Sequence, residues 1–372
     1  MDVVVIGGGY AGLSCLLSLR RLCPEARLHL VDGRVSHVKL TRLHQTLRRP
    51  FSEIVCPFAL LAEKFGFSFI QAEIDMPETC LADWQAAKAL PLPQGDLPFD
   101  YLVIATGART PPLPRGKSSL TREDLLSGAG EQAFQKISRR EGGCPMEVAV
   151  VGGGATGLQF LFELRSVAAE ENWPVHLHLV DLLPRLLPGY PEGFDLYLRK
   201  RFRELDIDYL PGASYLGQED GGISLQSAGE HVAMTLACDL VLLFPGVAAV
   251  PRLFETNRYG QVLDEGLPLE NIYAAGDCSH FLSKGLNAQT AQAALRKGAL
   301  VAENIAHAQV GRRRKAYLYR EIGYFISLGS GDGLGWLGWR GNLLSGTAAF
   351  AIKEALETQY DLFLRGIDSY LK

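Results

Sequence analysis

The sequence predicts an α/β fold in which one supersecondary unit occurs twice. Each copy is a short β-branched run, a G-x-G-x-x-G turn and a helical pattern, first as "VVVIGGGYAG" near the start and again as "VAVVGGGATG" in the middle. An unbroken apolar run of this kind is typical of a buried parallel strand. A further "LHLVD" strand follows each helix and ends in an acidic residue, Asp32 or Asp181. Because the whole pattern recurs, it is far more specific than a lone glycine motif.

The glycines of these two turns predict dinucleotide binding. The first glycine of each motif allows a tight turn, the second lets the backbone approach a pyrophosphate, and the third lets helix and strand pack closely. The phosphates then lie at the positive end of the helix. The terminal aspartate suits a free ribose 2′-hydroxyl and repels a 2′-phosphate, so we expect NADH rather than NADPH at one of the sites. The glycines are Gly7, Gly9 and Gly12 in the first turn and Gly152, Gly154 and Gly157 in the second.

Composition narrows the class of protein. A chain of 372 residues is long enough for two domains, and 47% apolar with 21% charged residues is typical of a globular protein. The net charge of −4, without a basic block, argues against nucleic-acid binding. No apolar run reaches the length of a membrane-spanning helix, and the glycine turn follows Met1 too closely for a signal peptide, so we expect a cytoplasmic location. The seven cysteines never form C-x-x-C, which predicts reduced thiols and no metal site.

Two later stretches extend the pattern. "FDYLVIATGART" is a strand that runs into Thr106 and Gly107, and "NIYAAGDCSH" is a strand that runs into Gly276 and Asp277. With the two turns in this order, residues 1–305 resemble the two-dinucleotide flavoprotein reductases of the pyridine nucleotide-disulfide oxidoreductase superfamily. The resemblance implies FAD at the Asp32 site and NADH at the Asp181 site. It also implies two Rossmann-like domains, with the NAD domain inserted in the FAD domain, plus a small C-terminal α+β segment.

These features set the expected domain boundaries. We expect the FAD domain at 1–112 and again at 249–310, the NAD(P)H domain at 113–248, and a C-terminal strand and helix segment at 311–372. The first junction is the proline-rich "TPPLPRGKSS", in which neither helix nor strand would persist. Within the inserted domain, the alternating "QEDGGISLQSAGEHVAMT" predicts a small antiparallel sheet.

The resemblance further implies which residues hold the cofactors. Lys39 and Arg42 could reach the FAD phosphates or ribose, and the alternative is that they lie on a solvated surface. Arg185 is expected to be a surface charge. The FAD candidates are Gly7, Gly8, Gly9, Tyr10, Ala11, Gly12, Asp32, Lys39, Arg42, Ala72, Ala105, Thr106, Gly107, Gly276, Asp277, Ala288 and Gln289. The NAD candidates are Gly152, Gly154, Thr156, Gly157, Asp181 and Gly246.

Cysteine placement bears on the electron acceptor. A redox disulfide would need a cysteine pair after the Asp32 strand or a C-x-x-C in the NAD domain, but Cys144 and Cys238 stand alone and no cysteine follows Cys278. "TAQAA" instead resembles the signature of type II NADH:quinone oxidoreductases, which implies a quinone bound near Gln292 and a role for Gln159 near the nicotinamide. Arg296 replaces the second glutamine of that signature, and Gln159 replaces a glutamate.

Two alternatives stay open. One is a soluble NAD(P)H reductase that serves a protein carrier such as rubredoxin or ferredoxin. The other follows from "HVKLTRLHQ", which resembles apoptosis-inducing-factor-like reductases and implies a redox-responsive flavoprotein. His37 and His44 in that stretch are candidate acids, although a lone histidine is more often packed or on the surface.

The C-terminal segment predicts strands with glycine turns followed by an amphipathic helix. Ala348, Ile352, Leu356, Tyr360, Phe363, Ile367 and Leu371 recur at helical spacing. By the same resemblance this segment would contact the membrane surface peripherally, on the inner face of the cell membrane. The alternative is that its apolar face packs on the FAD domain or on a second copy in a homodimer.

Overall fold

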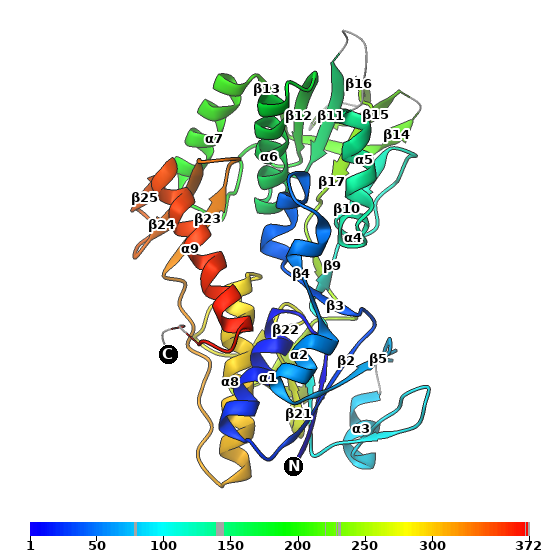
Figure 1. Ribbon diagram of the computed structural model, residues 1–372, viewed down its shortest axis with the longest axis vertical. Helices are drawn as coiled ribbons and strands as arrows, with labels where there is room; N and C mark the ends of the chain where they lie inside the picture. The colour runs from blue at the N-terminus through cyan, green and yellow to red at the C-terminus, as the bar shows by residue number, and fades with distance from the viewer. Residues whose placement is uncertain are drawn as a thin grey trace. The chain divides into compact units, whose positions relative to one another are not determined.

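The computed structural model describes residues 1–77, 80–138, 145–219, 221–227, 229, 232–368 and 370. The chain divides into two compact units (Figure 1). Cys144 lies outside the described residues. Unit 1 comprises Met1–Val38, Val55–Arg109 and Ala248–Glu321, and unit 2 comprises Lys39–Ile54, Thr110–Val247 and Ile322–Lys372.

Unit 1 is built on an eight-stranded sheet in the order β22-β19-β20-β21-β8-β1-β2-β5. β1 lies between β2 and β8 and is parallel to both, so the strand order reverses beside it. In open α/β sheets, ligands bind at the carboxyl ends of the strands at such a reversal. The strands of unit 1 are β1 (Asp2–Ile6), β2 (Arg27–Asp32), β3 (Ser36–Val38), β4 (Val55–Pro57), β5 (Ser68–Gln71), β6 (Ala89–Leu90), β7 (Leu97–Pro98), β8 (Tyr101–Ile104), β9 (Ala108–Arg109), β18 (Ala248–Ala249), β19 (Phe254–Thr256), β20 (Gln261–Asp264), β21 (Leu267–Ala274) and β22 (Ser279–Phe281).

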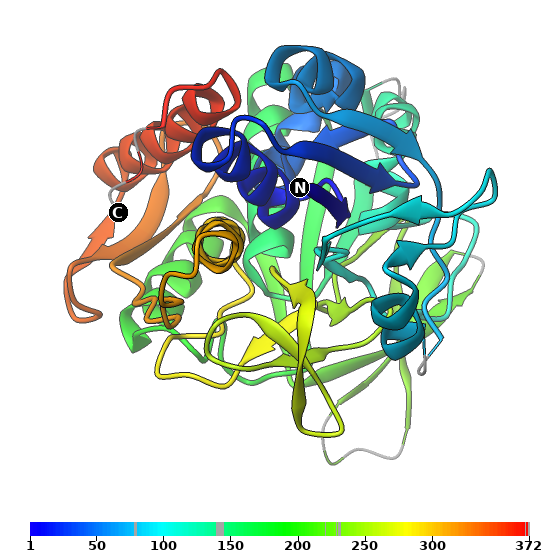
Figure 2. The same ribbon diagram turned by 90° about the horizontal axis from the view of Figure 1, so that it is seen from below.

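The helices of unit 1 are α1 (Tyr10–Leu22), α2 (Phe58–Phe65), α3 (Cys80–Ala87) and α8 (Ala291–Gln309). The two long ones, α1 and α8, pack side by side (Figure 2). The Ser14 hydroxyl donates a 2.7 Å hydrogen bond to the Leu295 carbonyl across this contact. A Cβ atom on Gly298 would lie 2.1 Å from the Ala11 carbonyl oxygen, so the two helices can approach this closely only with glycine there. The contact fixes α1, whose amino end follows the first glycine turn.

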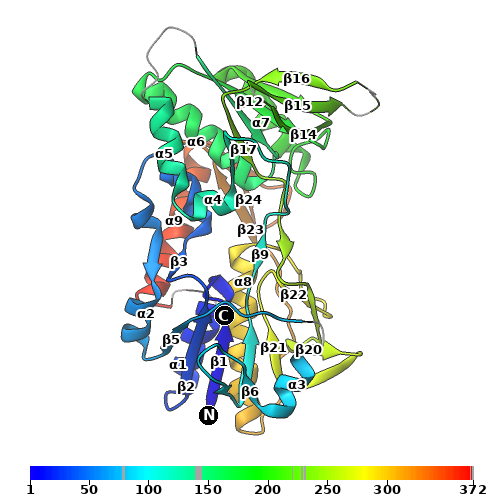
Figure 3. The ribbon, with the colours of Figure 1, turned by 90° about the vertical axis from the view of Figure 1, so that its right-hand side faces the viewer.

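Unit 2 repeats the arrangement in a five-stranded parallel sheet, β10-β17-β11-β12-β13. β11 lies between β12 and β17, as β1 lies between β2 and β8. The antiparallel sheet β14-β15-β16 lies near this sheet (Figure 3), and Val180, Ile223 and Leu225 share one apolar cluster. The predicted antiparallel sheet is thereby confirmed. The strands of unit 2 are β10 (Ser119–Thr121), β11 (Met146–Val151), β12 (Val175–Asp181), β13 (Ile207–Pro211), β14 (Ala213–Glu219), β15 (Gly222–Ser227), β16 (Met234–Ala237), β17 (Leu240–Leu243), β23 (Gly323–Ser327), β24 (Gly333–Leu337) and β25 (Leu343–Ser345).

The helices of unit 2 come from three separate parts of the chain. They are the 3-10 helices η1 (Leu40–Leu47) and η2 (Phe51–Ile54) and the α-helices α4 (Arg122–Leu126), α5 (Ala129–Ser138), α6 (Ala155–Glu171), α7 (Glu192–Leu205) and α9 (Thr347–Leu364). Helix α9 packs on the β23-β24-β25 sheet, as the strand and helix pattern of the C-terminal segment predicts.

The compact units differ from the expected domains in two places. At two other places they nearly agree: unit 1 gives way to unit 2 after Arg109, and unit 2 gives way to unit 1 after Val247, within three residues of the expected junctions at 112 and 248. However, residues 39–54 belong to unit 2 and not to the unit that carries the first glycine turn. The C-terminal segment is divided as well, because the part up to Glu321 belongs to unit 1 and the rest belongs to unit 2. Contacts of η1 with α6 and with polar side chains of α9, described below, account for the first difference.

The predicted stripe on the last helix is wrong in part. Ala348 is exposed and Ile352 is half-buried, whereas Lys353 and Glu357 are buried. The helix also ends at Leu364, so Ile367 lies beyond it, and Leu371 lies outside the described residues. The face that packs is partly ionic, which a search for apolar periodicity cannot detect. In the part of the chain that the structure describes, no helix has the length and apolar character needed to span a membrane.

Candidate active site

The turn after β1 has the geometry that its glycines predict. Gly7 has a φ of +102°, and a Cβ atom on it would lie 2.3 Å from the Ala105 carbonyl oxygen. A Cβ atom on Gly12 would lie 1.9 Å from the Gly7 carbonyl oxygen. At Gly9, in contrast, a Cβ atom would have no described neighbour within 4 Å, and no described side chain caps the amino end of α1. The first N–H groups of the helix therefore face open space suited to a pyrophosphate.

Asp32 ends β2 and is buried beside this turn. Its carboxylate accepts hydrogen bonds from the backbone N–H of Gly8 at 2.7 Å and of Arg34 at 2.8 Å. The Arg34 guanidinium lies 3.2 Å from the same carboxylate. Ala72, just beyond β5, donates its N–H to the Asp32 carbonyl at 3.2 Å, which places this candidate at the same sheet edge.

His37 also supports the first turn. Its Nδ1 lies 2.9 Å from the Gly8 carbonyl oxygen, to which it donates, and its ring meets the Tyr10 ring edge-on at 5.2 Å. The side chain is 1% exposed. The arrangement is that of a packed histidine that holds a backbone turn.

The remaining FAD candidates of unit 1 follow neighbouring strands. Thr106 follows β8 and donates its hydroxyl to the Val250 carbonyl, and Asp277 follows β21, which pairs with β8. Ala105 and Gly107 flank Thr106, and Gly276 precedes Asp277. Because β21, β8 and β1 are parallel neighbours, all of these positions lie at one edge of the sheet.

The segment before α8 carries the other candidates. Ala288 and Gln289 precede the helix, and Gln292 is its second residue and is half-buried. The Thr290 hydroxyl caps the helix by accepting the Ala293 N–H at 3.2 Å. Gln292 therefore lies in the first turn of a capped helix.

Lys297 is a residue of this region that the sequence did not single out. It is 2% exposed and donates to the Ser279 carbonyl at 2.6 Å and the Gly276 carbonyl at 3.2 Å. Its ammonium lies 5.2 Å from the centre of the Phe281 ring. Burial lowers the pKa of Lys297 to about 8. The ammonium thus stabilises the glycine turn before Asp277, and because its partners are mainly backbone carbonyls, no sequence motif reveals it.

The second turn, after β11, repeats the first closely. Gly152 has a φ of +105°, and a Cβ atom on Gly157 would lie 2.0 Å from its carbonyl oxygen. A built Cβ atom on Gly154 again has nothing within 4 Å, and Thr156 lies half-buried in the first turn of α6. The Asp181 carboxylate accepts the N–H of Gly153 at 2.5 Å. It also accepts the Leu183 N–H at 2.7 Å, and Gly246 lies exposed just past β17 with a φ of +96°.

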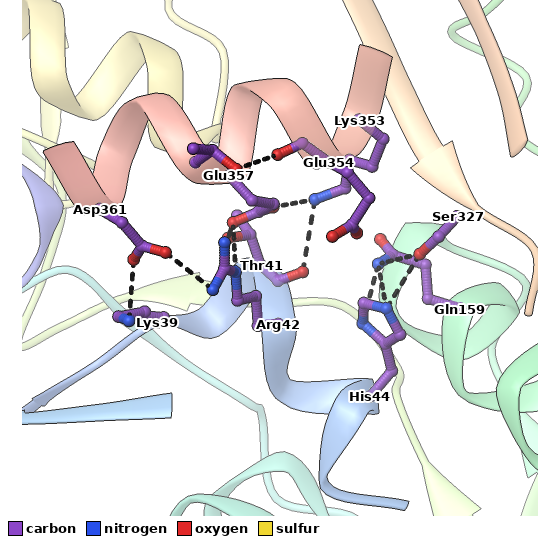
Figure 4. Close-up of polar contacts among 11 residues, drawn as sticks. Lys39, Thr41, Arg42, His44, Gln159, Ser327, Lys353, Glu354, Glu357 and Asp361 are labelled. Atoms are coloured by element: carbon purple, nitrogen blue, oxygen red, sulfur yellow. Dashed lines mark hydrogen bonds and ion pairs between the residues drawn. The ribbon is translucent and has the colours of Figure 1, made fainter. Parts of the chain in front are cut away.

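Lys39 and Arg42 lie in unit 2, on or next to η1, where both form ion pairs with α9. The Lys39 ammonium lies 2.8 Å from Asp361, and the Arg42 guanidinium lies 3.0 Å from Asp361 and 3.4 Å from Glu357 (Figure 4). Glu357 also pairs with Lys353 and accepts the Thr41 hydroxyl at 2.8 Å. These charges are therefore engaged within unit 2, and their contact with FAD stays a prediction.

Gln159 lies in a buried polar cluster on the other side of η1. Its amide nitrogen lies 2.9 Å from His44 Nδ1 and 3.3 Å from the Ser327 hydroxyl, which in turn lies 2.9 Å from His44 Nε2 (Figure 4). Burial, with the nearby charges of Lys353 and Arg42, lowers the pKa of His44 to about 3, so the ring is neutral. His44 is a packed hydrogen-bonding residue here, and a contact between Gln159 and a nicotinamide stays a prediction.

Taken together, each unit offers an open glycine turn at an uncapped helix start and a buried carboxylate at the end of the next strand. In each unit these features are suited to the pyrophosphate and ribose of a dinucleotide. Two such sites in one chain are typical of a protein that binds two dinucleotides. Residues 1–298 match the family model described as pyridine nucleotide-disulphide oxidoreductase, and the chain belongs to this family. The predicted fold class, the enzyme class and the cofactors FAD and NADH are thereby confirmed.

Similar proteins cover nearly the whole chain. A type II NADH:quinone oxidoreductase of Staphylococcus aureus (strain NCTC 8325 / PS 47) is 25% identical over 396 residues, which span 98% of this chain and 96% of the relative. Two solved structures share the fold. The sulfide:quinone oxidoreductase of Aquifex aeolicus has a TM-score of 0.81 at 18% identity, covering 99% of this chain and 92% of that one. NDH2 of Plasmodium falciparum in complex with NADH has a TM-score of 0.79 at 16% identity, covering 96% and 94%.

Proposed function

We propose that this chain oxidises NADH and delivers the electrons to a quinone. The observation that carries the proposal is the similarity to type II NADH:quinone oxidoreductases, which extends over 98% of this chain and 96% of the relative. A match confined to the two glycine turns would support only the shared cofactors. This one includes the C-terminal segment, which lies beyond the family model's last matched residue.

The two glycine turns would hold the cofactors. Gly7, Gly9 and Gly12 with Asp32 would bind FAD in unit 1, and Gly152, Gly154 and Gly157 with Asp181 would bind NADH in unit 2. When bound, the flavin supplies the two-electron chemistry between nicotinamide and acceptor, while the protein supplies position and electric field. Gln292 would contribute to the acceptor site from the first turn of α8, where N–H groups and the helix dipole favour negative charge.

The described cysteines do not provide a dithiol route. Cys15, Cys23, Cys56, Cys238 and Cys278 are all free thiols. Burial raises the pKa of the Cys15 and Cys278 thiols, and it raises that of Cys238 to about 11, so none of these three is a ready thiolate near neutral pH. The state of these described cysteines supports direct electron transfer from the flavin to a small acceptor.

The test is anaerobic stopped-flow absorbance of the purified yellow holoprotein. NADH should bleach the flavin rapidly, NADPH should do so far more slowly, and a soluble ubiquinone or menaquinone analogue should restore the colour rapidly. Fast bleaching with slow recovery in quinone but fast recovery with ferredoxin or rubredoxin would replace the quinone by a protein carrier. Slow recovery with every acceptor would favour a redox-responsive flavoprotein.

We also propose that the C-terminal segment contacts the membrane surface. Its exposed apolar side chains include Trp339 at 69%, Ile322 at 65% and Leu337 at 43% exposure, and Arg340 follows Trp339. Exposed tryptophan beside arginine suits the interface between lipid headgroups and water. Sedimentation with anionic vesicles should be reduced by Trp339→Ser. If that variant instead loses a dimer seen by light scattering, the surface serves a homodimer.

A further inference from the structure

A cluster of histidines and carboxylates lies at the amino end of the parallel sheet of unit 2, away from the glycine turn. Glu147 is near the start of β11, His176 and His178 are on β12, and Asp208 is near the start of β13; these strands are neighbours (Figure 1). Glu147 is in register with His176, and His178 is in register with Asp208. Because side chains alternate along a strand, all four lie on one face of the sheet.

The imidazole rings lie between the two carboxylates. Glu147 Oε2 is 3.0 Å from His176 Nδ1 and 2.7 Å from His178 Nε2. Asp208 Oδ2 is 3.3 Å from His176 Nε2 and 3.4 Å from His178 Nδ1. All four ring nitrogens thus face a carboxylate oxygen.

The cluster offers fewer hydrogen-bond donors than it has nitrogen–carboxylate contacts. A neutral imidazole has one N–H, so two neutral rings supply two donors for four nitrogen–carboxylate contacts. The other two nitrogens would direct lone pairs at anionic oxygens. His178 is 4% exposed, and its buried Nδ1 has no hydrogen-bond partner. A metal ion between the rings and Glu147 would take up one of these lone pairs from each ring.

We propose that Glu147, His176 and His178 bind a divalent first-row transition-metal ion, for which Zn²⁺ is the probe. One carboxylate oxygen and one nitrogen from each ring lie within 4.8 Å of one another. Tetrahedral zinc with bonds of about 2.0–2.1 Å needs ligand atoms about 3.3 Å apart, so small side-chain movements suffice. Mixed nitrogen and oxygen ligands favour such ions over Mg²⁺ or Ca²⁺, which prefer oxygen alone.

Asp208 completes the arrangement from the far side of both rings. Once His176 Nδ1 and His178 Nε2 bind the ion, the opposite nitrogens carry hydrogens and donate to Asp208. A carboxylate that accepts from metal-bound histidines fixes their tautomer and orientation, and its loss typically weakens metal affinity 10- to 100-fold. The Glu147 side chain is 29% exposed and that of His176 is 34% exposed, so the ion can enter from solvent and retain a water ligand.

The first repeat shows how the same position is filled without a metal. By strand register, Asp2 and His29 correspond to Glu147 and His178, Arg27 takes the place of His176, and Ser68 takes the place of Asp208. The Arg27 guanidinium lies 2.6 Å from Asp2, whereas His29 lies 3.9 Å from it. In unit 1 the Arg27 guanidinium is therefore the positive charge beside the carboxylate. His176→Arg would place a guanidinium at the corresponding position of unit 2.

The test is zinc binding by the FAD-loaded protein after dialysis against a chelator. Equilibrium dialysis with metal analysis should find one tight zinc per chain in the wild type and in the matched control His29→Gln. His176→Arg and His178→Gln should abolish it, and Asp208→Asn should weaken it 10- to 100-fold. At a hundredfold excess over Kd, zinc should raise the melting temperature by roughly 5 °C in the wild type and not in His176→Arg.

Retained flavin and circular dichroism establish that each variant is folded. If His176→Arg does not fold, His178→Gln and Asp208→Asn carry the test. Equal zinc binding in wild type and ligand variants would overturn the proposal, as would no tight zinc in the wild type.

Discussion

The two glycine turns share one backbone geometry but have different surroundings. Gly7 and Gly152 differ by 3° in φ (+102° and +105°), and the close contacts of Gly12 and Gly157 differ by 0.1 Å (1.9 and 2.0 Å). At Gly8, however, the first turn packs against the Phe58 ring, and at Gly153 the second turn packs against the Asp181 carboxylate and Leu186. The turn is determined by its own sequence, whereas its neighbours come from distant parts of the chain.

A second difference lies in the interiors of the units. One core of unit 1 gathers apolar side chains from β1, β8, β21 and α3. Both units also bury polar side chains. Those of unit 1, such as His37 and Lys297, bond mainly to backbone carbonyls, whereas unit 2 has side-chain clusters around His44, Glu163 and Glu357. All three clusters involve residues of the 39–54 segment, since Arg48 pairs with Glu163. Residues 39–54 are thus held in unit 2 by polar contacts as well as by buried apolar side chains such as Leu43 and Ile54.

The largest expected effect comes from adding a side chain at Gly12 or Gly157, where the helix backbone lies against a carbonyl oxygen of the turn. Gly12→Val and Gly157→Val each place a side chain against a carbonyl oxygen of the turn, which must then open. We expect Gly12→Val to lose at least nine-tenths of its flavin, and Gly157→Val to keep its flavin but to raise the KM for NADH at least tenfold. Flavin absorbance per chain and steady-state kinetics measure both. Equal flavin loss in the two variants would contradict the assignment of one cofactor to each unit.

The next effect tests the polar anchoring of unit 2. Glu357→Gln leaves Arg42 and Lys353 buried beside a neutral amide, which should lower the free energy of unfolding by about 3 kcal/mol. Asp361→Asn, at a more exposed pair, should cost about 1 kcal/mol or less. Urea unfolding followed by tryptophan fluorescence reports mainly on unit 2, which contains Trp173, Trp336 and Trp339. Equal costs for the two variants would show that burial of the ion pairs does not matter.

The features that the sequence predicts are those formed by residues close together in the chain, and the features that it misses are formed by distant residues. The glycine turns, their strands and the terminal aspartates were predictable because all residues of each motif lie within about 30 positions of one another. The Ser327 partner of His44 is 283 positions away, and nothing in the local pattern points to it. The face of α9 was mistaken because Lys353 and Glu357 are buried as a pair, whereas periodicity assigns charges to solvent. The His176 cluster was missed because its residues lie on three strands that are far apart in the sequence, so no short motif contains them.

Acidification should weaken unit 2 through His44. The pKa of this ring is lowered from 6.5 to about 3 in the folded protein, chiefly by burial, so the unfolded chain binds the extra proton first. The stabilisation is complete above pH 6.5 and is lost as the pH falls from there toward 3. Between pH 7 and pH 5, we expect His44 to account for a loss of about 2 kcal/mol. Urea unfolding at both pH values should show a steeper pH dependence in the wild type than in His44→Gln, and equal slopes would exclude this role.

The smallest effect separates the two roles of the terminal aspartates. Asp181 accepts the N–H groups of Gly153 and Leu183, and it is also the residue expected to bind the NADH ribose. Asp181→Asn keeps one acceptor oxygen but removes the charge, so kcat/KM for NADH should fall about tenfold, or about 1.4 kcal/mol, and the ratio of NADPH to NADH activity should rise. The matched variant Asp32→Asn should weaken flavin retention and leave this ratio unchanged. If Asp181→Asn does not change the ratio either, its carboxylate serves the backbone of the turn alone, and another group of unit 2 selects the nucleotide.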